Sequence, residues 1–561
     1  MPCKEEILSN DYADIIVDYI LPERLLEQNI PPFCFRLLNE EYGFAHVNRS
    51  QAPPISIGSY GYAAIPKLYG LMQTFHTENL TAMGNLRMQG PPLSLQGKGV
   101  IIGFIDTGIR YQSEAFLDEA GNSRIISIWD QTIQDGTPPA GFDYGTEYTR
   151  EDINRALQAD NPLDIVPSTD ENGHGTAMAS AAAGSVLDMG LTLRGAAPQA
   201  DIAVVKLKEA KQYLRDYYLI AEDAVAYQEN NIMEAVKYLE QMTIVFERPV
   251  VIVLGLGTNL GNHAGGSPLG VYLNSIADKR SRAVIVCGGN EGDKRHHYMG
   301  TVPQQVEVRV AEGVTGFCME MWNSSLDSYH LFIQTPGGER TAMIDFQSGF
   351  DRPYSFVFDK TVIYASAVLV ERESGEELVF LRFENPSQGI WRIVVSPREN
   401  TKISTSGLFH MWLPITEFID GEVEFLEPSA DVTLTEPSNA EKVITISTYN
   451  GLNGNWFPES GRGFARDNRV KPEFAAPGVQ VSTAVGERTG SSLAAALAAG
   501  CVAQFMEWAV VEGNSILVET RTIESYFIRG AVREEGIQYP DKRWGYGKLN
   551  ISGTFETLAR L

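Results

Sequence analysis

Four short segments of the sequence place reactive side chains among small residues. Asp106 opens the tripeptide DTG at the end of the apolar run GVIIGFID, and His174 lies between two glycines in GHGT. Asn290 lies in GGNEG after the apolar run RAVIVCGG, and Ser492 lies in GSS before the run LAAALAAG. An aspartate, a histidine and a serine are the groups that nucleophilic cleavage of an acyl bond requires.

Each of these residues also has a structural interpretation. An aspartate such as Asp106 can cap a turn, and DTG also occurs in aspartic proteases. Ser492 can be the N-cap of the helix that follows it, and Asn290 can be a left-handed turn residue. A histidine between glycines is unusual in a core, and we expect the imidazole of His174 to be accessible. Only the combination of all four segments favours catalysis.

The elements around these residues predict an α/β fold. Strand-like runs at 99–106, 200–208, 249–257 and 282–289 are continuously apolar, as in parallel strands buried on both faces. The stretch 230–247 has apolar residues at helical spacing. This alternation predicts a central parallel sheet, and Asp106 falls at the carboxyl end of a strand, where such sheets place their active sites.

Composition changes along the chain divide it into three expected regions. Residues 1–75 form a mixed α/β segment, rich in proline and tyrosine near its end. Residues 303–440 contain about eight short β-rich runs separated by turn signals such as TPGGE, which predict an antiparallel sandwich or jelly roll. The α/β pattern resumes with KVITISTYN. We therefore expect a catalytic domain of 76–302 and 441–561 that carries 303–440 as an insertion.

The order Asp, His, Asn, Ser in an α/β chain resembles the subtilisin superfamily. DTG, GHGT, GGNEG and GSSLAAALAAG match its motifs, and KPEFAAPG at 471–478 is similar to its segment before the serine. The resemblance covers about 85–300 and 440–520. It implies a subtilisin-like three-layer fold in which Ser492 attacks, His174 is the general base and Asp106 orients it. Asn290 and the Ser492 amide would hold the oxyanion, with no metal or cofactor required.

Two serines compete for the role of nucleophile, because Ser491 stands where subtilisins usually have threonine. The family's helix glycine lies eight residues after its serine, and Gly500 lies eight residues after Ser492. Ser492 is therefore the expected nucleophile. Leu493 replaces a frequent methionine and the helix lacks the usual Pro-His pair, but neither change removes a catalytic group.

The resemblance also implies where a substrate binds. Gly255-Leu256-Gly257 is similar to the family's substrate-binding strand, whose backbone pairs with an extended peptide. The same three residues and Cys287-Gly288-Gly289 are the expected pocket walls, while the pocket floor is not readable from sequence. No loop shows an EF-hand spacing, which leaves calcium binding open.

A narrower resemblance is to the Csp germination proteases of spore-forming Clostridia. It rests on RIISIWDQT (124–132), FDYGTEYT (142–149), IPKLYGLMQ (65–73) and the position of the insertion. It implies that residues 1–75 are a prodomain, a chaperone and inhibitor that the protease cleaves within 70–80, with Gln73 a candidate for the residue before the cut. The implied partners are this cleaved prodomain and a protein substrate, the zymogen of a spore-cortex hydrolase.

Two rival functions stay open at this point. A general intracellular subtilisin for protein turnover is usually shorter and lacks the insertion. A catalytically silent signalling pseudoprotease would have lost triad residues, whereas this sequence keeps all three.

Composition excludes some classes of binding partner and indicates the cellular compartment in which the protein is made. A net charge of −26 and a sequence pI of about 4.8 argue against nucleic acid and against anionic membrane surfaces. Five cysteines without repeated spacing make a disulfide framework unlikely and favour reduced thiols. The N-terminus does not read as a signal peptide, and no run reaches the length of a membrane span. We expect synthesis in the cytoplasm and, under the narrower resemblance, packaging into a spore.

Overall fold

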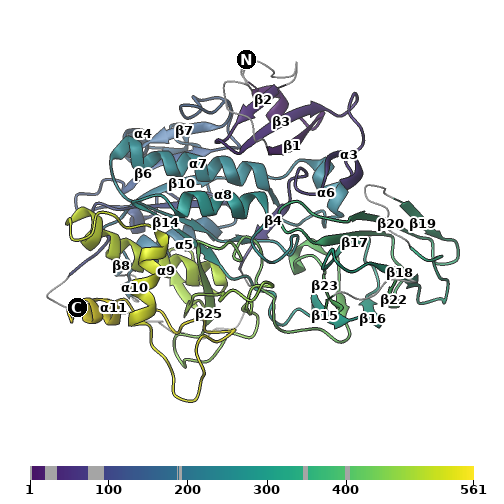
Figure 1. Ribbon diagram of the computed structural model, residues 1–561. Helices are drawn as coiled ribbons and strands as arrows, with labels where there is room; N and C mark the ends of the chain where they lie inside the picture. Colours follow the sequence, from purple (N-terminus) through teal and green to yellow (C-terminus); the bar gives the residue numbers. More distant parts are fainter. Residues whose placement is uncertain are drawn as a thin grey trace.

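The computed structural model in Figure 1 has a central sheet, an N-terminal region above it and a β-rich region to one side. It describes residues 3–18, 34–73, 94–185, 187–188, 192–344, 352–398 and 405–560.

The central sheet has eight strands and confirms the predicted α/β class. Its order is β26-β25-β14-β12-β5-β10-β6-β7, and every neighbouring pair is parallel except β6 with β7. The strands are β5 (Ile101–Asp106), β6 (Ile125–Asp130), β7 (Thr146–Thr149), β10 (Asp201–Lys206), β12 (Val250–Leu254), β14 (Arg282–Cys287), β25 (Ile444–Tyr449) and β26 (Phe474–Pro477).

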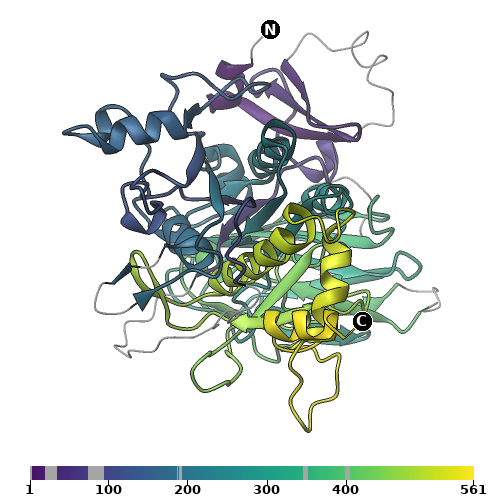
Figure 2. The ribbon, with the colours of Figure 1, turned by 90° about the vertical axis from the view of Figure 1, so that its left-hand side faces the viewer.

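Helices cover both faces of this sheet and give three layers. Alternate residues of β5 show why: Ile101 and Ile105 pack into one core, and Ile102 and Phe104 into the other. One face carries α7 (Glu229–Phe246) and α8 (Pro268–Ala277). The opposite face carries α5 (His174–Ala183), α9 (Ser491–Met506), α10 (Thr520–Gly530) and α11 (Ile551–Leu558). Figure 2 shows α9 to α11 in yellow on the side away from the purple N-terminal sheet.

Short elements connect these layers. They are α4 (Arg150–Leu157), α6 (Gln212–Tyr218), β8 (Leu187–Asp188), β9 (Thr192–Leu193), β27 (Val481–Thr483), β28 (Gly486–Arg488), the 3₁₀ turns η1 (Glu114–Phe116) and η2 (Pro162–Asp164), and the π-helical turn η4 (Glu507–Val511).

The helix that begins at Ser491 is apolar enough to satisfy a membrane test. Ser491–Val511 meets the length and composition of one span, but 78% of its most apolar window is buried inside the fold. Every residue of α9 is buried. A buried core helix of a folded protein has the same composition, so the test is weak evidence for a membrane span.

The N-terminal region is a small sheet packed beside α6 and α7. It contains α1 (Lys4–Leu8), β1 (Tyr12–Asp18), β2 (Cys34–Leu37), β3 (Tyr42–Asn48) and α3 (Ile57–Tyr60), with strand order β1-β3-β2. Asp14, fully buried, joins it to the catalytic region: its carboxylate accepts from Lys211 Nζ at 2.8 Å and Gln228 Nε2 at 2.5 Å. Burial opposes ionisation, but Lys211 and His46 hold the pKa of Asp14 below its usual value.

One cysteine pair contradicts the expectation of reduced thiols. Cys3 and Cys34 form a disulfide between the start of the N-terminal region and β2. The two residues are 31 positions apart, and only the pairing of β2 with β3 and of β1 with β3 brings them together. Cys287, Cys318 and Cys501 are free and buried, and burial raises the pKa of each thiol to about 12.

The β-rich region is two antiparallel sheets around a separate core. One sheet has the order β15-β23-β17-β21-β20-β19 and the other β18-β22-β16-β24. The strands are β15 (His297–Thr301), β16 (Gln304–Val310), β17 (Gly316–Asn323), β18 (Tyr329–Gln334), β19 (Arg352–Phe356), β20 (Thr361–Val368), β21 (Glu377–Glu384), β22 (Gly389–Pro397), β23 (Leu408–Trp412) and β24 (Val423–Phe425). The sheets thus begin six residues before the expected boundary at 303 and end at Phe425, before 440. The name jelly roll stays a prediction.

Neutral histidines lie where this insertion meets the catalytic region. His297 Nδ1 donates to the Asp431 carbonyl at 2.6 Å, which leaves Nε2 to accept from His410 Nδ1 at 3.0 Å. Both rings also stack near Trp412. Burial lowers the pKa of His410 to about 4, and burial together with His410 holds the pKa of His297 well below its usual value.

This pair predicts a loss of stability in acid. An unfolded histidine titrates near pH 6.5, so below that pH protons favour the unfolded chain until the folded pKa is reached. We expect His410 to lower the unfolding free energy by about 1.5 kcal/mol between pH 6.5 and 5, and His297 to add to this loss. Denaturant unfolding at both pH values measures this. In His410→Asn the fall should be smaller, and an equal fall would contradict the assignment.

Candidate active site

The three predicted catalytic residues meet at one edge of the central sheet. Asp106 is the last residue of β5, His174 the first of α5 and Ser492 the second of α9. His174 Nδ1 lies 2.7 Å from Asp106 Oδ1, and His174 Nε2 lies 2.8 Å from Ser492 Oγ. The base and the nucleophile therefore each lie at the start of a helix, and both helix starts point toward the edge of the sheet where β5 ends.

The expectation of an accessible imidazole is wrong. His174 is 2% exposed, and Asp106 and Ser492 are fully buried. The reason is that the chain's own residues 68–73 fill the groove beside them. Gln73, for example, donates from Nε2 to Asn172 Oδ1 at 3.3 Å, two residues before His174.

The geometry selects Ser492 over Ser491. The Ser491 amide donates to Asn290 Oδ1 at 3.0 Å, so this serine holds the asparagine rather than facing the histidine. Asn290 Nδ2 is consequently turned the other way, and it is buried without a hydrogen-bond partner among the described residues. An unpaired donor next to the nucleophile is the arrangement that a developing oxyanion requires.

A peptide strand already occupies the groove. The strand β4 (Leu68–Leu71) lies between β11 (Tyr227–Gln228) and β13 (Leu256–Gly257) in a three-stranded sheet. Leu71 pairs with Leu256 and Gly70 with Gly257, both antiparallel. Gly255 extends this pairing, because its carbonyl accepts from the Met72 amide at 3.0 Å. Residues 255–257 thus pair with an extended segment of the same chain, and their binding of a substrate stays a prediction.

The strand brings the Met72 carbonyl, and not that of Gln73, to the nucleophile. The Ser492 amide donates to the Met72 oxygen at 3.3 Å. A Cβ on Gly490 would lie 2.5 Å from that oxygen and 2.8 Å from Gln73 Cα, so glycine is needed where the peptide passes. Gln73 was the candidate for the residue before the scissile bond, whereas the strand register places the carbonyl of the preceding residue, Met72, at the nucleophile.

Thr435 lines the pocket between two of the expected wall residues, Gly257 and Gly289, and the sequence did not assign it to the pocket. A Cβ on Gly257 would lie 2.3 Å from Thr435 Oγ1 and 3.1 Å from Met72 Sδ, and one on Gly289 would lie 2.6 Å from Thr435 Oγ1. Gly288 lies beside them, against Leu434 and the Ile446 carbonyl. Thr435 belongs to no motif, and it enters the pocket only because the chain returns from the insertion there.

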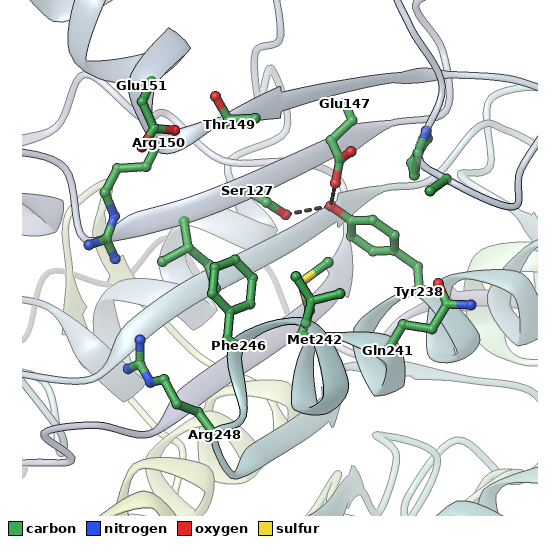
Figure 3. Close-up of a pocket in the computed structure, with 14 residues that line it drawn as sticks. Ser127, Glu147, Thr149, Arg150, Glu151, Tyr238, Gln241, Met242, Phe246 and Arg248 are labelled. Carbon is green, nitrogen blue, oxygen red and sulfur yellow. Dashed lines mark hydrogen bonds between the residues drawn. The ribbon is translucent and has the colours of Figure 1, made fainter.

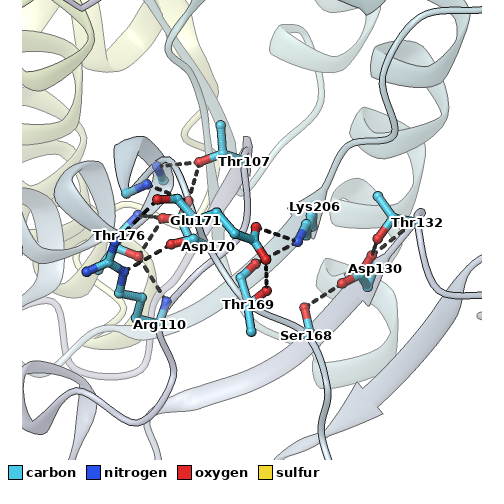
Figure 4. Close-up of polar contacts among 12 residues, drawn as sticks. Thr107, Arg110, Asp130, Thr132, Ser168, Thr169, Asp170, Glu171, Thr176 and Lys206 are labelled. Carbon is cyan, nitrogen blue, oxygen red and sulfur yellow. Dashed lines mark hydrogen bonds and ion pairs between the residues drawn. The ribbon is translucent and has the colours of Figure 1, made fainter. Parts of the chain in front are cut away.

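A second carboxylate, Asp170, links the loop of Asp106 to the helix of His174 (Figure 4). Its Oδ1 accepts from Thr107 Oγ1 at 2.8 Å and from the Gly173 amide at 2.8 Å. Its Oδ2 accepts from the Thr176 amide at 2.9 Å and hydroxyl at 2.6 Å. Thr107 in turn accepts from the Gly175 amide at 3.0 Å. Asp170 is therefore a positioning residue that sequence reasoning missed, although an aspartate shortly before a helix start is a recognisable signal.

Another cleft lies between β7 and the end of α7 (Figure 3). It has a volume of about 440 Å³. Tyr238 donates to Glu147 at 2.6 Å inside it, and Arg150 and Arg248 at its rim both pair with Asp201. None of the triad residues lines it. The cleft that matters for chemistry is thus the one that β4 fills.

The fold and the geometry of this site are those of a class of serine proteases, and a family model identifies that class. The model of the subtilase family, Peptidase S8, matches residues 97–313 and 421–547, more than half of the chain. The chain therefore belongs to the subtilase family of serine endopeptidases. The gap in the match, 314–420, falls within the inserted sheets.

Among individual proteins, the structure is similar to the CspB protease of Clostridium perfringens, with 29% identity and a TM-score of 0.73 over 83% of this chain and 94% of that one. Subtilisin-like protease SBT3.4 of Arabidopsis thaliana is 23% identical over 81% of this chain and 62% of its own length. SBT3.1 of the same plant is 35% identical over 20% of this chain and 16% of its own. The chain thus spans less than two thirds of these plant relatives.

The Asp170 network predicts a defect in reactivity rather than in folding. In Asp170→Asn, one carboxylate oxygen is replaced by an NH₂ group, which cannot accept the hydrogen bonds that Thr107, Gly173 or Thr176 donate. We therefore expect the Asp106 loop and α5 to shift relative to each other. We expect fluorophosphonate labelling of Ser492 to slow about a hundredfold, as small misplacements of catalytic groups do.

Asp130→Asn is the matched control. Asp130 is equally buried and accepts from Thr132 and Ser168, outside the triad. Labelling rates and unfolding midpoints are compared for both variants. Equal labelling in the two would refute the positioning role.

Proposed function

We propose that this protein is a serine endopeptidase that cleaves its own chain between Met72 and Gln73. The observation that carries the proposal is the position of the Met72 carbonyl, 3.3 Å from the Ser492 amide on a strand paired with 255–257. Residues 1–72 would then be a prodomain that remains in the groove as the inhibitor.

The chemistry follows from the groups present. Ser492 Oγ attacks the Met72 carbonyl carbon while His174 Nε2 takes the hydroxyl proton. Asp106 accepts from His174 Nδ1 and stabilises the imidazolium. The Ser492 amide and Asn290 Nδ2 bind the oxyanion. His174 then gives its proton to the Gln73 nitrogen as the C–N bond breaks, and water hydrolyses the acyl-enzyme.

Retention of the cleaved segment is supported by buried contacts outside the groove. Asp14 binds Lys211 and Gln228, and Tyr62 donates to Glu320 of β17 at 2.7 Å. Glu320 also accepts from the Gly261 amide at 2.9 Å. One carboxylate of the insertion thus connects the N-terminal segment to the catalytic region.

We further propose a narrow substrate range, namely the zymogen of a spore-cortex hydrolase during germination. The similarity to the CspB protease supports this proposal.

Replacing the nucleophile tests self-cleavage. Ser492→Ala should yield only the intact 61.8 kDa chain, whereas wild type should yield a second N-terminus at Gln73. Intact mass and N-terminal sequencing measure both. Ser491→Ala removes a neighbouring hydroxyl that does not face His174 and should still be processed. A cut near residue 72 in Ser492→Ala would mean that another protease makes it.

Digestion of unfolded casein tests the narrow range. The rate is expressed per site labelled by a fluorophosphonate, so that molecules with an occupied groove are not counted. We expect casein to survive conditions under which a broad subtilisin degrades it completely. Rapid, indiscriminate digestion would instead favour the turnover protease, and no labelling even after the prodomain has been displaced would favour the silent scaffold.

A further inference from the structure

The insertion sends one segment back across the substrate groove. This segment, residues 413–418, follows β23 and ends with the 3₁₀ turn η3 (Thr416–Phe418), and we name it the strap. On the β13 side, the Leu413 carbonyl accepts from Asn259 Nδ2 at 3.1 Å, and the amide and hydroxyl of Thr416 each donate to Glu291 at 3.1 Å. On the β11 side, the Phe418 carbonyl accepts from the Ala221 amide at 3.0 Å. The strap is therefore fastened on both flanks of the groove.

The strap meets the bound strand at Gly70. A Cβ on Gly70 would lie 2.5 Å from Ile415 Cδ1 and 3.2 Å from Phe418 Cε1. Its φ lies outside the left-handed region, so the backbone itself does not require glycine here. The two strap side chains are the reason that a larger residue does not fit.

The contact is hard to relieve by movement. Ile415 is fully buried and Phe418 is 1% exposed, in the same core as Leu68 and Met72 of the bound peptide. Glu291, which holds Thr416, is itself buried and accepts from His296 Nδ1 at 2.7 Å. An added methyl group in a packed and tethered place of this kind causes strain rather than a simple shift.

We propose that the strap makes glycine obligatory at the third residue before the scissile bond, both in the chain's own segment and in its protein substrates. The inference rests on the proposed function, since it takes β4 as a substrate occupying the groove. The insertion thereby sets specificity: Ile415 and Phe418 of a β-sandwich, rather than a loop of the catalytic sheet, select the sequence that is cut.

Two quenched peptides test the proposal on the processed protein after the cleaved prodomain has been displaced from the groove, with fluorophosphonate labelling of Ser492 as the check that the groove is open. One carries Leu-Tyr-Gly-Leu-Met-Gln-Thr, the sequence of residues 68–74, and the other has alanine in place of glycine. We expect kcat/KM to fall about tenfold to a hundredfold with alanine. In Ile415→Ala the two peptides should differ by less than about threefold, since the space for the methyl group is restored.

Ile419→Ala is the matched control, because Ile419 lies just after the strap but packs into the core of the insertion. It should retain the full preference for glycine. Equal cleavage of both peptides by wild type would overturn the proposal while leaving the protease assignment intact, and so would an undiminished preference in Ile415→Ala.

A second measurement does not depend on catalysis. In the Ser492→Ala chain, Gly70→Ala should lower the unfolding midpoint. In a chain that also carries Ile415→Ala, the same Gly70→Ala substitution should lower the midpoint much less. If neither peptide is cleaved and Ser492 is not labelled, the proposed function fails. The unfolding midpoints of the single and double variants then still show whether the strap excludes a side chain at position 70, because that comparison requires no cleavage. Additive effects of the two substitutions would refute the contact.

Discussion

The pairing of one short strand with two edges of the groove is the interaction on which the rest of the structure depends. β4 joins β11 and β13, and in doing so it brings the N-terminal region, the catalytic sheet and the insertion to one place. Its backbone hydrogen bonds bind any sequence, so they give affinity without selection. Selection comes from what surrounds the strand: Thr435 below Met72, and the strap above Gly70. The triad is buried because this strand covers it.

Much of the site was predictable because subtilisin motifs concentrate the reacting groups in short segments. Asp106, His174, Asn290 and Ser492 all lie beside glycine or small residues, and their order along the chain identified them. The sheet was predictable for a related reason, since strands buried on both faces are continuously apolar. Local sequence carries such information when the function of a residue depends mainly on its immediate neighbours.

The corrections all involve contacts between distant segments. The shift from Gln73 to Met72 depends on strand register against 255–257, which a motif does not encode. The Cys3–Cys34 bond joins residues that only the N-terminal sheet brings together, and spacing alone did not reveal it. The burial of His174 comes from a segment a hundred residues away. Asp170 was overlooked because its partners are mostly backbone amides and hydroxyls, which no pattern of charged residues announces.

The unpaired Nδ2 of Asn290 has a consequence for how the enzyme uses its free energy. A buried donor without an acceptor costs a folded protein about 1–3 kcal/mol. While the Met72 carbonyl is planar, it makes no hydrogen bond with Asn290 Nδ2. Only when the carbon becomes tetrahedral does its oxygen move toward the amide, so the destabilisation is relieved at the barrier rather than before it. In the resting state Asn290 Nδ2 has no partner among the described residues, and the transition state is the form of the complex in which it gains one.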